Sequence, residues 1–231
     1  MFESLFKIYN EFGWQLLSGL WLTIQLVVLA GIIGFILAVP IGVARLSKNP
    51  VFAVPAYLYT LIFRGSPLYV QIFLIYYGLG QFPWMRSSWA WYFFQQAYFC
   101  AIFAFSLNTA GYMAELIRGG IKAVPHGERE AALACGMSRF TMLRRILIPR
   151  AIRMSLPALS NEVILLLKST VLASTITMLD LMGTAKNIYT RTYDTTPLYV
   201  VAVIYLVLVW LLGGFFRGLE KKFNKFQTAR Q

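Results

Sequence analysis

The sequence predicts an all-α protein that crosses a membrane several times. Of its 231 residues, 58% are hydrophobic and only 13% are charged, whereas a soluble domain has roughly 25% charged residues. The mean hydropathy of +0.64 agrees with this difference. Long uncharged runs alternate with short segments that hold most of the 21 lysines and arginines. Helix is the expected form of these runs, because lipid offers the backbone no hydrogen-bonding partner.

Five runs are long enough to cross a bilayer, since one helical span needs about 20 apolar residues. We expect one transmembrane domain over residues 1–231, with spans at about 14–44, 51–80, 91–117, 154–180 and 195–216. Arg64 interrupts the second run, and the fourth run carries Glu162 and Lys168. The fourth span is therefore expected to be broken or enclosed by protein.

The distribution of basic residues predicts the orientation. The loops after the first and third spans and the C-terminal tail hold far more lysine and arginine than the other two loops. Cytoplasmic loops of membrane proteins carry this excess. We therefore expect the N-terminus outside and the C-terminus in the cytoplasm. The same clustering between apolar runs argues against nucleic acid as the reason for the net charge of +12.

The sequence has few of the side chains that metal-dependent or histidine-dependent catalysis requires. His126 is the only histidine, and Cys100 and Cys135 fall in different settings, one in an apolar run and one in a polar segment. Zinc sites and catalytic triads need more of these side chains, at closer or more regular spacing. We expect neither a metal site nor a catalytic centre.

The long basic segment 119–150 lies between the third and fourth spans. Val124 to Gly127 has the composition of a turn, and a short helix is expected from Glu128 to Cys135. Gly136 is expected to end that helix, and Ser138 to cap a second one. Pro149 is expected to end the regular pattern.

A spaced motif occupies this segment. Glu130, Ala131 and Ala132 are followed after three residues by Gly136, and after nine more by Ile146-Leu147-Ile148-Pro149. This resembles the EAA signature of bacterial ABC importer permeases, with Ile148 where leucine is usual. In that family the motif forms a helix that docks into the ATP-hydrolysing subunit. The resemblance therefore makes these residues candidates for coupling to an ATPase: Glu130, Ala131, Ala132, Gly136, Ile146 and Pro149. The alternative is an ordinary amphipathic loop that lies on anionic headgroups.

Two further segments narrow the resemblance to the permeases for polar amino acids of the histidine, arginine and opine type. Residues 63–71 read Phe-Arg-Gly-Ser-Pro-Leu-Tyr-Val-Gln, and residues 107–115 read Leu-Asn-Thr-Ala-Gly-Tyr-Met-Ala-Glu. No G-x-x-x-x-G-K-[ST] element for ATP occurs. The resemblance implies no cofactor in this chain and ATP with Mg²⁺ on a partner chain. It also implies two ATPase subunits, a second permease, homologous or identical, and a solute-binding protein, all serving a bacterial cytoplasmic membrane.

Polar residues within the apolar runs are candidates for a substrate site, because ionisable groups are costly in a membrane. An amino acid needs a cationic partner for its carboxylate and an acidic one for its amine. We predict substrate contacts from these residues: Arg64, Ser66, Asn108, Tyr112, Glu115, Glu162 and Lys168. Asn108, Tyr112 and Glu115 recur at i, i+4 and i+7 and so share a helix face. The alternative is that the charged members pair with one another and hold the bundle together.

The segment Arg64 to Pro67 is expected to interrupt its span, either as a broken helix or as a simple kink. Broken helices near the middle of the membrane commonly line substrate sites. The function that follows is import of polar, basic amino acids such as arginine, histidine, lysine, ornithine or opines. An ion-coupled secondary amino-acid carrier is the alternative, although such carriers usually show an inverted repeat, and none is visible here. An intramembrane enzyme ranks last.

Overall fold

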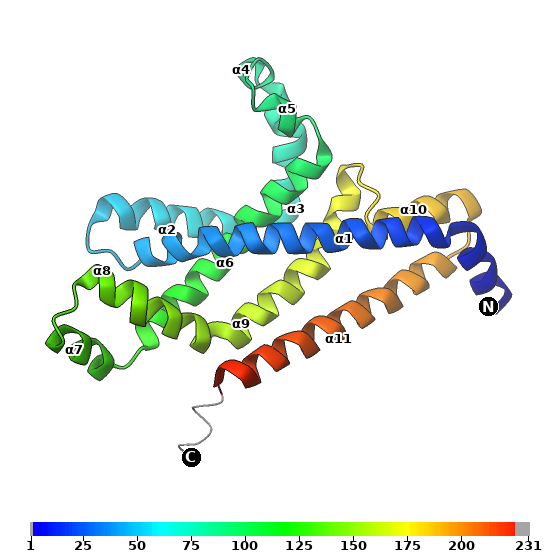
Figure 1. The fold of residues 1–231 in the computed structure, drawn as a ribbon. Helices are drawn as coiled ribbons and strands as arrows, with labels where there is room; N and C mark the ends of the chain where they lie inside the picture. The colour runs from blue at the N-terminus through cyan, green and yellow to red at the C-terminus, as the bar shows by residue number, and fades with distance from the viewer. Residues whose placement is uncertain (1, 225–231) are drawn as a thin grey trace.

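The computed structural model describes residues 2–224, with side chains from residue 10 to residue 223, and this part of the chain consists of helices, turns and loops (Figure 1). The predicted all-α class is therefore confirmed for the described residues. The α-helices are α1 (Phe2–Ala44), α2 (Pro50–Gly65), α3 (Leu68–Phe73), α4 (Pro83–Arg86), α5 (Trp91–Phe94), α6 (Ala97–Ala123), α7 (His126–Ala134), α8 (Arg139–Met142), α9 (Ile148–Ser169), α10 (Leu181–Thr192) and α11 (Thr196–Asn224). Short π and 3₁₀ segments join some of them. The C-terminal residues 225–231, which we expect in the cytoplasm, lie outside the described residues.

Four helical stretches in the described residues are long and apolar enough to cross a membrane: Asn10–Ala44, Ala97–Ala123, Arg139–Ile176 and Thr196–Phe223. A fifth candidate is the pair Pro50–Gly65 and Leu68–Gln81, which is bent by 102°. Helix α6, which corresponds to the third predicted span, begins at Ala97 and not near residue 91. Gln95 and Gln96 interrupt the helical run after the short α5.

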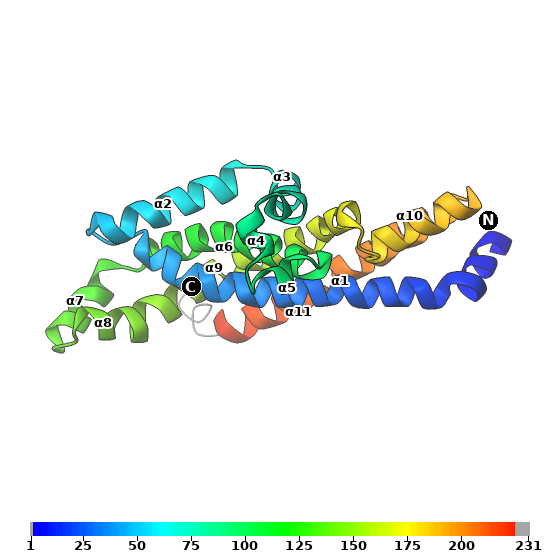
Figure 2. The same ribbon diagram turned by 90° about the horizontal axis from the view of Figure 1, so that it is seen from above.

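The helices form an elongated bundle in which α1 lies along α6, α6 packs on α9, and α11 packs on α9 and α10. Figures 1 and 2 show α7 and α8 at one end and α10 at the other. Small residues permit the close crossings, as is common between membrane helices. A Cβ added at Gly120 of α6 would lie 2.8 Å from the carbonyl oxygen of Ala151 in α9.

Helix α10 is missing from the sequence-based prediction, which ended the fourth span at residue 180. In the structure α9 ends at Ser169, a 3₁₀ segment runs to Ile176, and Asp180 caps α10. The Asp180 carboxylate accepts hydrogen bonds from the amides of Gly183 (3.0 Å) and Met182 (3.3 Å). Asp180 is fully buried, and this burial raises the pKa of its carboxyl group to about 6.

The prediction that Pro149 ends the regular pattern is wrong. Helix α8 continues through a π-helical turn, Leu143–Leu147, directly into α9, and Pro149 lies in the first turn of α9. At this junction the Ile148 amide donates to the carbonyl of Leu143. A proline inside a continuous helix leaves one carbonyl without its usual helical partner, and the π-helical turn directly before Pro149 is the local irregularity that accommodates it.

Candidate functional site

The bend between α2 and α3 creates the site. Pro67 disfavours helical backbone at the residue before it, and Ser66 is extended, with φ −105° and ψ 146°. Carbonyl groups that lose their helical partners in a membrane must find others. The side-chain amide of Gln71 donates to the carbonyl oxygens of Phe63 and Ser66, both at 3.0 Å. With a bend of 102°, the interruption is a broken helix and not a kink.

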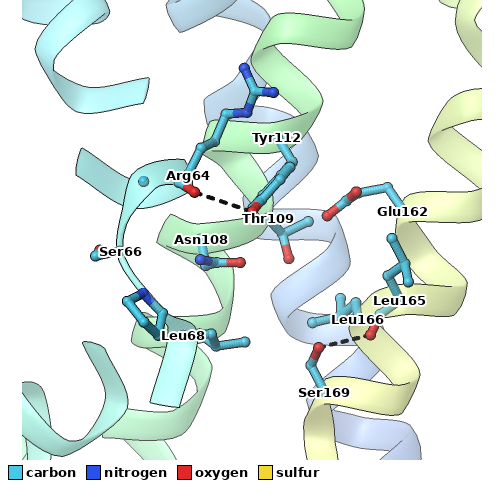
Figure 3. Close-up of a pocket in the computed structure, with 12 residues that line it drawn as sticks. Arg64, Ser66, Leu68, Asn108, Thr109, Tyr112, Glu162, Leu165, Leu166 and Ser169 are labelled. Carbon is cyan, nitrogen blue, oxygen red and sulfur yellow. Dashed lines mark hydrogen bonds between the residues drawn. The ribbon is translucent and has the colours of Figure 1, made fainter. Parts of the chain in front are cut away.

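A pocket of about 400 Å³ opens between this break, α6 and α9 (Figure 3). It is lined by Arg64, Gly65, Ser66, Pro67, Leu68, Asn108, Thr109, Tyr112, Glu162, Leu165, Leu166 and Ser169. One side is therefore the broken segment, and α6 and α9 supply the rest. The size is typical of a pocket for a small molecule.

The pocket carries opposite charges on different walls. Arg64 belongs to the end of α2, and its guanidinium lies over the Tyr112 ring, 5.3 Å from the centroid. Glu162 reaches in from α9 (Figure 3). Among the described residues, none forms a hydrogen bond or an ion pair with the Glu162 carboxylate. The pocket thus offers a separate cation and anion, which suits a ligand that carries both charges.

Five of the seven predicted substrate residues line this pocket: Arg64, Ser66, Asn108, Tyr112 and Glu162. Ser66 serves the break itself, because its hydroxyl donates to the Ile62 carbonyl at 2.7 Å, and Figure 3 shows it turned away from the pocket. Tyr112 also contacts the break, through a hydrogen bond from its hydroxyl to the Arg64 carbonyl at 3.3 Å.

The other two predicted residues do not line the pocket. The Glu115 carboxylate is bound by Arg118 at 2.6 Å and by Arg45 at 2.8 Å, which matches the alternative that charged residues pair with one another. Lys168 is exposed on the surface of this chain.

Two polar residues that line the pocket, Thr109 and Ser169, were not predicted as substrate contacts. Ser169 follows Glu162 by seven residues, so the helical repeat places both on one face of α9 and could have indicated it. No comparable spacing indicated Thr109, because it is not on the i, i+4, i+7 face of α6 that Asn108 shares with Tyr112 and Glu115.

The predicted coupling segment forms α7, a turn and α8. Gly136 has a positive φ of 72°, and its amide donates to the Leu133 carbonyl at 2.9 Å while the Met137 amide donates to the Ala132 carbonyl at 3.1 Å. This pair of bonds is the Schellman motif that ends many helices at a glycine. Ser138 caps α8 as expected, because its hydroxyl accepts from the Thr141 amide at 3.2 Å.

The coupling candidates divide by exposure. Glu130, Ala131 and Gly136 are exposed, Ala132 is buried, and Ile146 and Pro149 are half-buried. The segment is tied to the bundle at two points. Arg129 donates to the Ile121 carbonyl of α6, and Arg150 of α9 lies 3.5 Å from the Glu128 carboxylate. A force on α7 would therefore act on both α6 and α9.

Comparison with known proteins identifies the family. Residues 16–225 match the model described as "Binding-protein-dependent transport system inner membrane component". The chain belongs to this family. Among the relatives of this inner membrane transport component is the octopine transport system permease protein OccM of Rhizobium radiobacter, 48% identical over 90% of this chain and 87% of the relative. Another is the histidine/lysine/arginine/ornithine transport system permease protein HisM of Escherichia coli K12, 40% identical over 96% of this chain and 95% of the relative.

A solved structure of a transporter is similar to this chain over nearly its whole length. The crystal structure of an amino acid ABC transporter with histidines contains a chain that is 33% identical to this one, with a TM-score of 0.82. The match covers 96% of this chain and 98% of that chain. The protein is therefore a permease subunit of an ABC transport system and not an enzyme. Its family implies ATPase subunits, a second permease and a binding protein as partners.

Proposed function

We propose that this permease imports basic amino acids or related opines across the bacterial cytoplasmic membrane, and that its substrate binds between Arg64 and Glu162. The observation that carries the proposal is the separation of these two charges on different walls of one pocket of about 400 Å³. Arg64 would bind the α-carboxylate, and Glu162 would bind the cationic side chain. The relatives named for octopine and for histidine, lysine, arginine and ornithine support the same substrate class.

The proposed topology has five spans, with the broken pair α2 and α3 as the second. The N-terminus is outside and the C-terminus is cytoplasmic, because the basic segment between α6 and α9 belongs inside. Figures 1 and 2 place α7 and α8 at one end of the bundle, as this orientation requires. The pocket then lies along the membrane helices, between the two ends.

The proposed coupling runs through α7. Two ATPase subunits, which carry ATP and Mg²⁺, would bind the exposed side of α7 on this chain and on a second permease. Leu133 of α7 and Phe140 of the neighbouring α8 would provide apolar contact, with 51% and 71% of their surface exposed. Closure of the ATPases would move α7, and with it α6 and α9, two of the elements that line the pocket. A solute-binding protein would deliver the substrate from outside.

Substrate-stimulated ATP hydrolysis tests this function. The permease would be purified with its ATPase, second permease and binding protein and reconstituted in lipid. Arginine, lysine, histidine, ornithine and octopine would then be compared with glutamine and glutamate. Stimulation by the basic compounds and octopine is the expected result. Stimulation by glutamine or glutamate alone would overturn the substrate class. Uptake driven by a proton gradient without ATP would favour the ion-coupled carrier.

A further inference from the structure

Glu115 lies beside the pocket without lining it, and three arginines surround its carboxylate. Arg118 Nη2 lies 2.6 Å from Oε2 and Arg45 Nε lies 2.8 Å from Oε1. The third, Arg64, approaches Oε2 only to 4.0 Å through its Nη1. The side chain of Glu115 is 12% exposed, whereas that of Arg64 is 43% exposed. Arg64 is thus the most loosely held of the three.

The three contacts differ in kind. Arg118 and Arg45 are at the distance of charge-assisted hydrogen bonds, so each is fixed by direct donation to the carboxylate. Arg45 is held further by the ring of Tyr57, at 4.7 Å from its centroid. Arg64 has the outer limit of an ion pair with Glu115, the face of Tyr112 and a longer-range attraction to Glu162, and no direct hydrogen bond to either carboxylate. Its guanidinium can therefore change partners at little cost.

The charge around Glu115 is unbalanced. Three guanidinium groups surround the Glu115 carboxylate, and Glu162, which lines the pocket with Arg64, is a second carboxylate within the electrostatic reach of Arg64. Three positive groups against two carboxylates still leave an excess of positive charge next to the pocket. A ligand carboxylate that entered the pocket would be attracted to this excess and would meet Arg64 first, because Arg64 alone among the three lines the pocket. Glu115 and this ligand carboxylate would then compete for one guanidinium.

We propose that Arg64 is shared between Glu115 and the α-carboxylate of the substrate, and that Glu115 is a positioning residue that weakens substrate binding by this competition. The inference rests on the proposed function, since it takes the pocket ligand to be an amino acid. Without substrate, Glu115 holds Arg64 toward the end of α6. With substrate, Arg64 turns to the ligand, and its return to Glu115 favours release. A moderate affinity in the membrane pocket suits a transporter, which must let its substrate go.

Equilibrium binding of L-arginine and of agmatine tests this sharing. Agmatine has the guanidinium of arginine and no carboxylate. The permease would be studied with its ATPase and second permease in lipid nanodiscs, without the binding protein. Glu115→Gln removes the competing charge, so L-arginine should bind about two- to fivefold more tightly, the range expected for a partly exposed ion pair. Agmatine should not gain affinity.

The role of Arg64 is isolated by a double-mutant comparison. In an Arg64→Met background, Glu115→Gln should leave the affinity for L-arginine unchanged. An equal gain for L-arginine and agmatine, no gain for either, or a gain that persists without Arg64 would overturn the sharing while the pocket stands. If Arg64→Met alone leaves the affinity for L-arginine unchanged, the pocket assignment fails instead.

A second variant keeps the test decisive if Glu115→Gln does not fold. Arg45→Gln removes a competitor of Arg64 for the Glu115 carboxylate, so Glu115 should hold Arg64 more firmly. The expected result is weaker binding of L-arginine, again only when Arg64 is present, and no matching loss for agmatine. Unchanged binding of L-arginine in Arg45→Gln would contradict the proposal.

Discussion

The side-chain amide of Asn108 donates to the Phe63 carbonyl at 2.9 Å and to Gln71 Oε1 at 3.1 Å, and so holds the broken helix against α6. Asn108 supplies a hydrogen-bond donor to a carbonyl group at the end of α2, where the helical backbone no longer provides one. Its nitrogen is committed to the break, which leaves its oxygen toward the pocket (Figure 3). One residue therefore stabilises the break and shapes the pocket that the break forms.

Asn108→Leu should destabilise the protein, because leucine has a similar size and cannot donate. The variant leaves Gln71 Oε1 without this donor in a buried place, and such a loss costs about 1–3 kcal/mol. We expect a lower melting temperature of the purified transporter complex and weaker binding of L-arginine. Asn161→Leu, at an exposed position of α9, is the matched control. Equal melting temperatures for the two variants would contradict the role assigned to Asn108.

Gly136 should tolerate asparagine and not valine. Its φ of 72° is left-handed, which costs a residue with a Cβ about 1–2 kcal/mol, and asparagine accepts this conformation better than a β-branched residue does. No atom lies within 4 Å of a Cβ added there, so backbone conformation alone decides. We expect Gly136→Val to assemble with the ATPase but to hydrolyse ATP without transport, and Gly136→Asn to stay coupled. Normal transport by Gly136→Val, measured in proteoliposomes, would be inconsistent with this role.

Two adjacent glycines of α6 should differ in their response to alanine. A Cβ at Gly120 would clash with Ser155 Oγ and would lie 2.8 Å from the Ala151 carbonyl oxygen, whereas a Cβ at Gly119 has no neighbour within 4 Å. Gly120→Ala must push α6 and α9 apart, which costs about 1–3 kcal/mol for overpacking. Gly119→Ala should be neutral or slightly stabilising, since alanine favours helix over glycine. Thermal unfolding of the two variants side by side would show the difference, and a similar loss in both would refute the close crossing.

Asp180 should make the stability of the end of the bundle that holds α10 depend on pH. Burial raises the pKa of its carboxyl group from 3.8 to about 6, so the folded state binds the proton more tightly than the unfolded state. The contribution of Asp180 to the free energy of unfolding should therefore be highest below about pH 4 and fall as pH rises through about 6, by about 1–3 kcal/mol. Asp180→Asn keeps a capping side chain and should remove this part of the slope. The difference in melting temperature between wild type and variant, measured from pH 4 to pH 7, should change over this window; a constant difference would count against it.

Periodicity and charge predicted the long helices well, because each apolar run must satisfy its own backbone in lipid. Pro67 after Gly65 indicated the break, and Gly136 and Ser138 indicated the end of α7 and the start of α8. These features are local, so the residues that cause them lie next to the structure they cause. The π-helical turn that admits Pro149 is not predictable in this way, since it depends on how α8 joins α9.

In the pocket, too, some features could be predicted from the sequence and others depend on the fold. Arg64 and Glu162 were predicted because ionisable groups in apolar runs are rare, and the structure places both in one pocket. Glu115 met the same criterion, yet it is bound by Arg45, which is 70 residues away in sequence. Composition cannot tell a paired charge from a free one when the partner is brought in by the fold. Helix α10 was missed for a related reason, because its apolar positions only face a core once α1 and α11 lie beside it.

Recognition of the cationic side chain of the substrate by Glu162 is tested most directly by two affinities for the transporter complex without its binding protein. The ligands are L-arginine and L-citrulline, which has a similar shape and the same α-ammonium and α-carboxylate but an uncharged side chain. Glu162→Gln should weaken the binding of L-arginine about 10- to 100-fold, as loss of a hydrogen bond to a charged group implies, and change that of L-citrulline by less than about twofold. Equal losses for both ligands, or an unchanged affinity for L-arginine, would contradict the account.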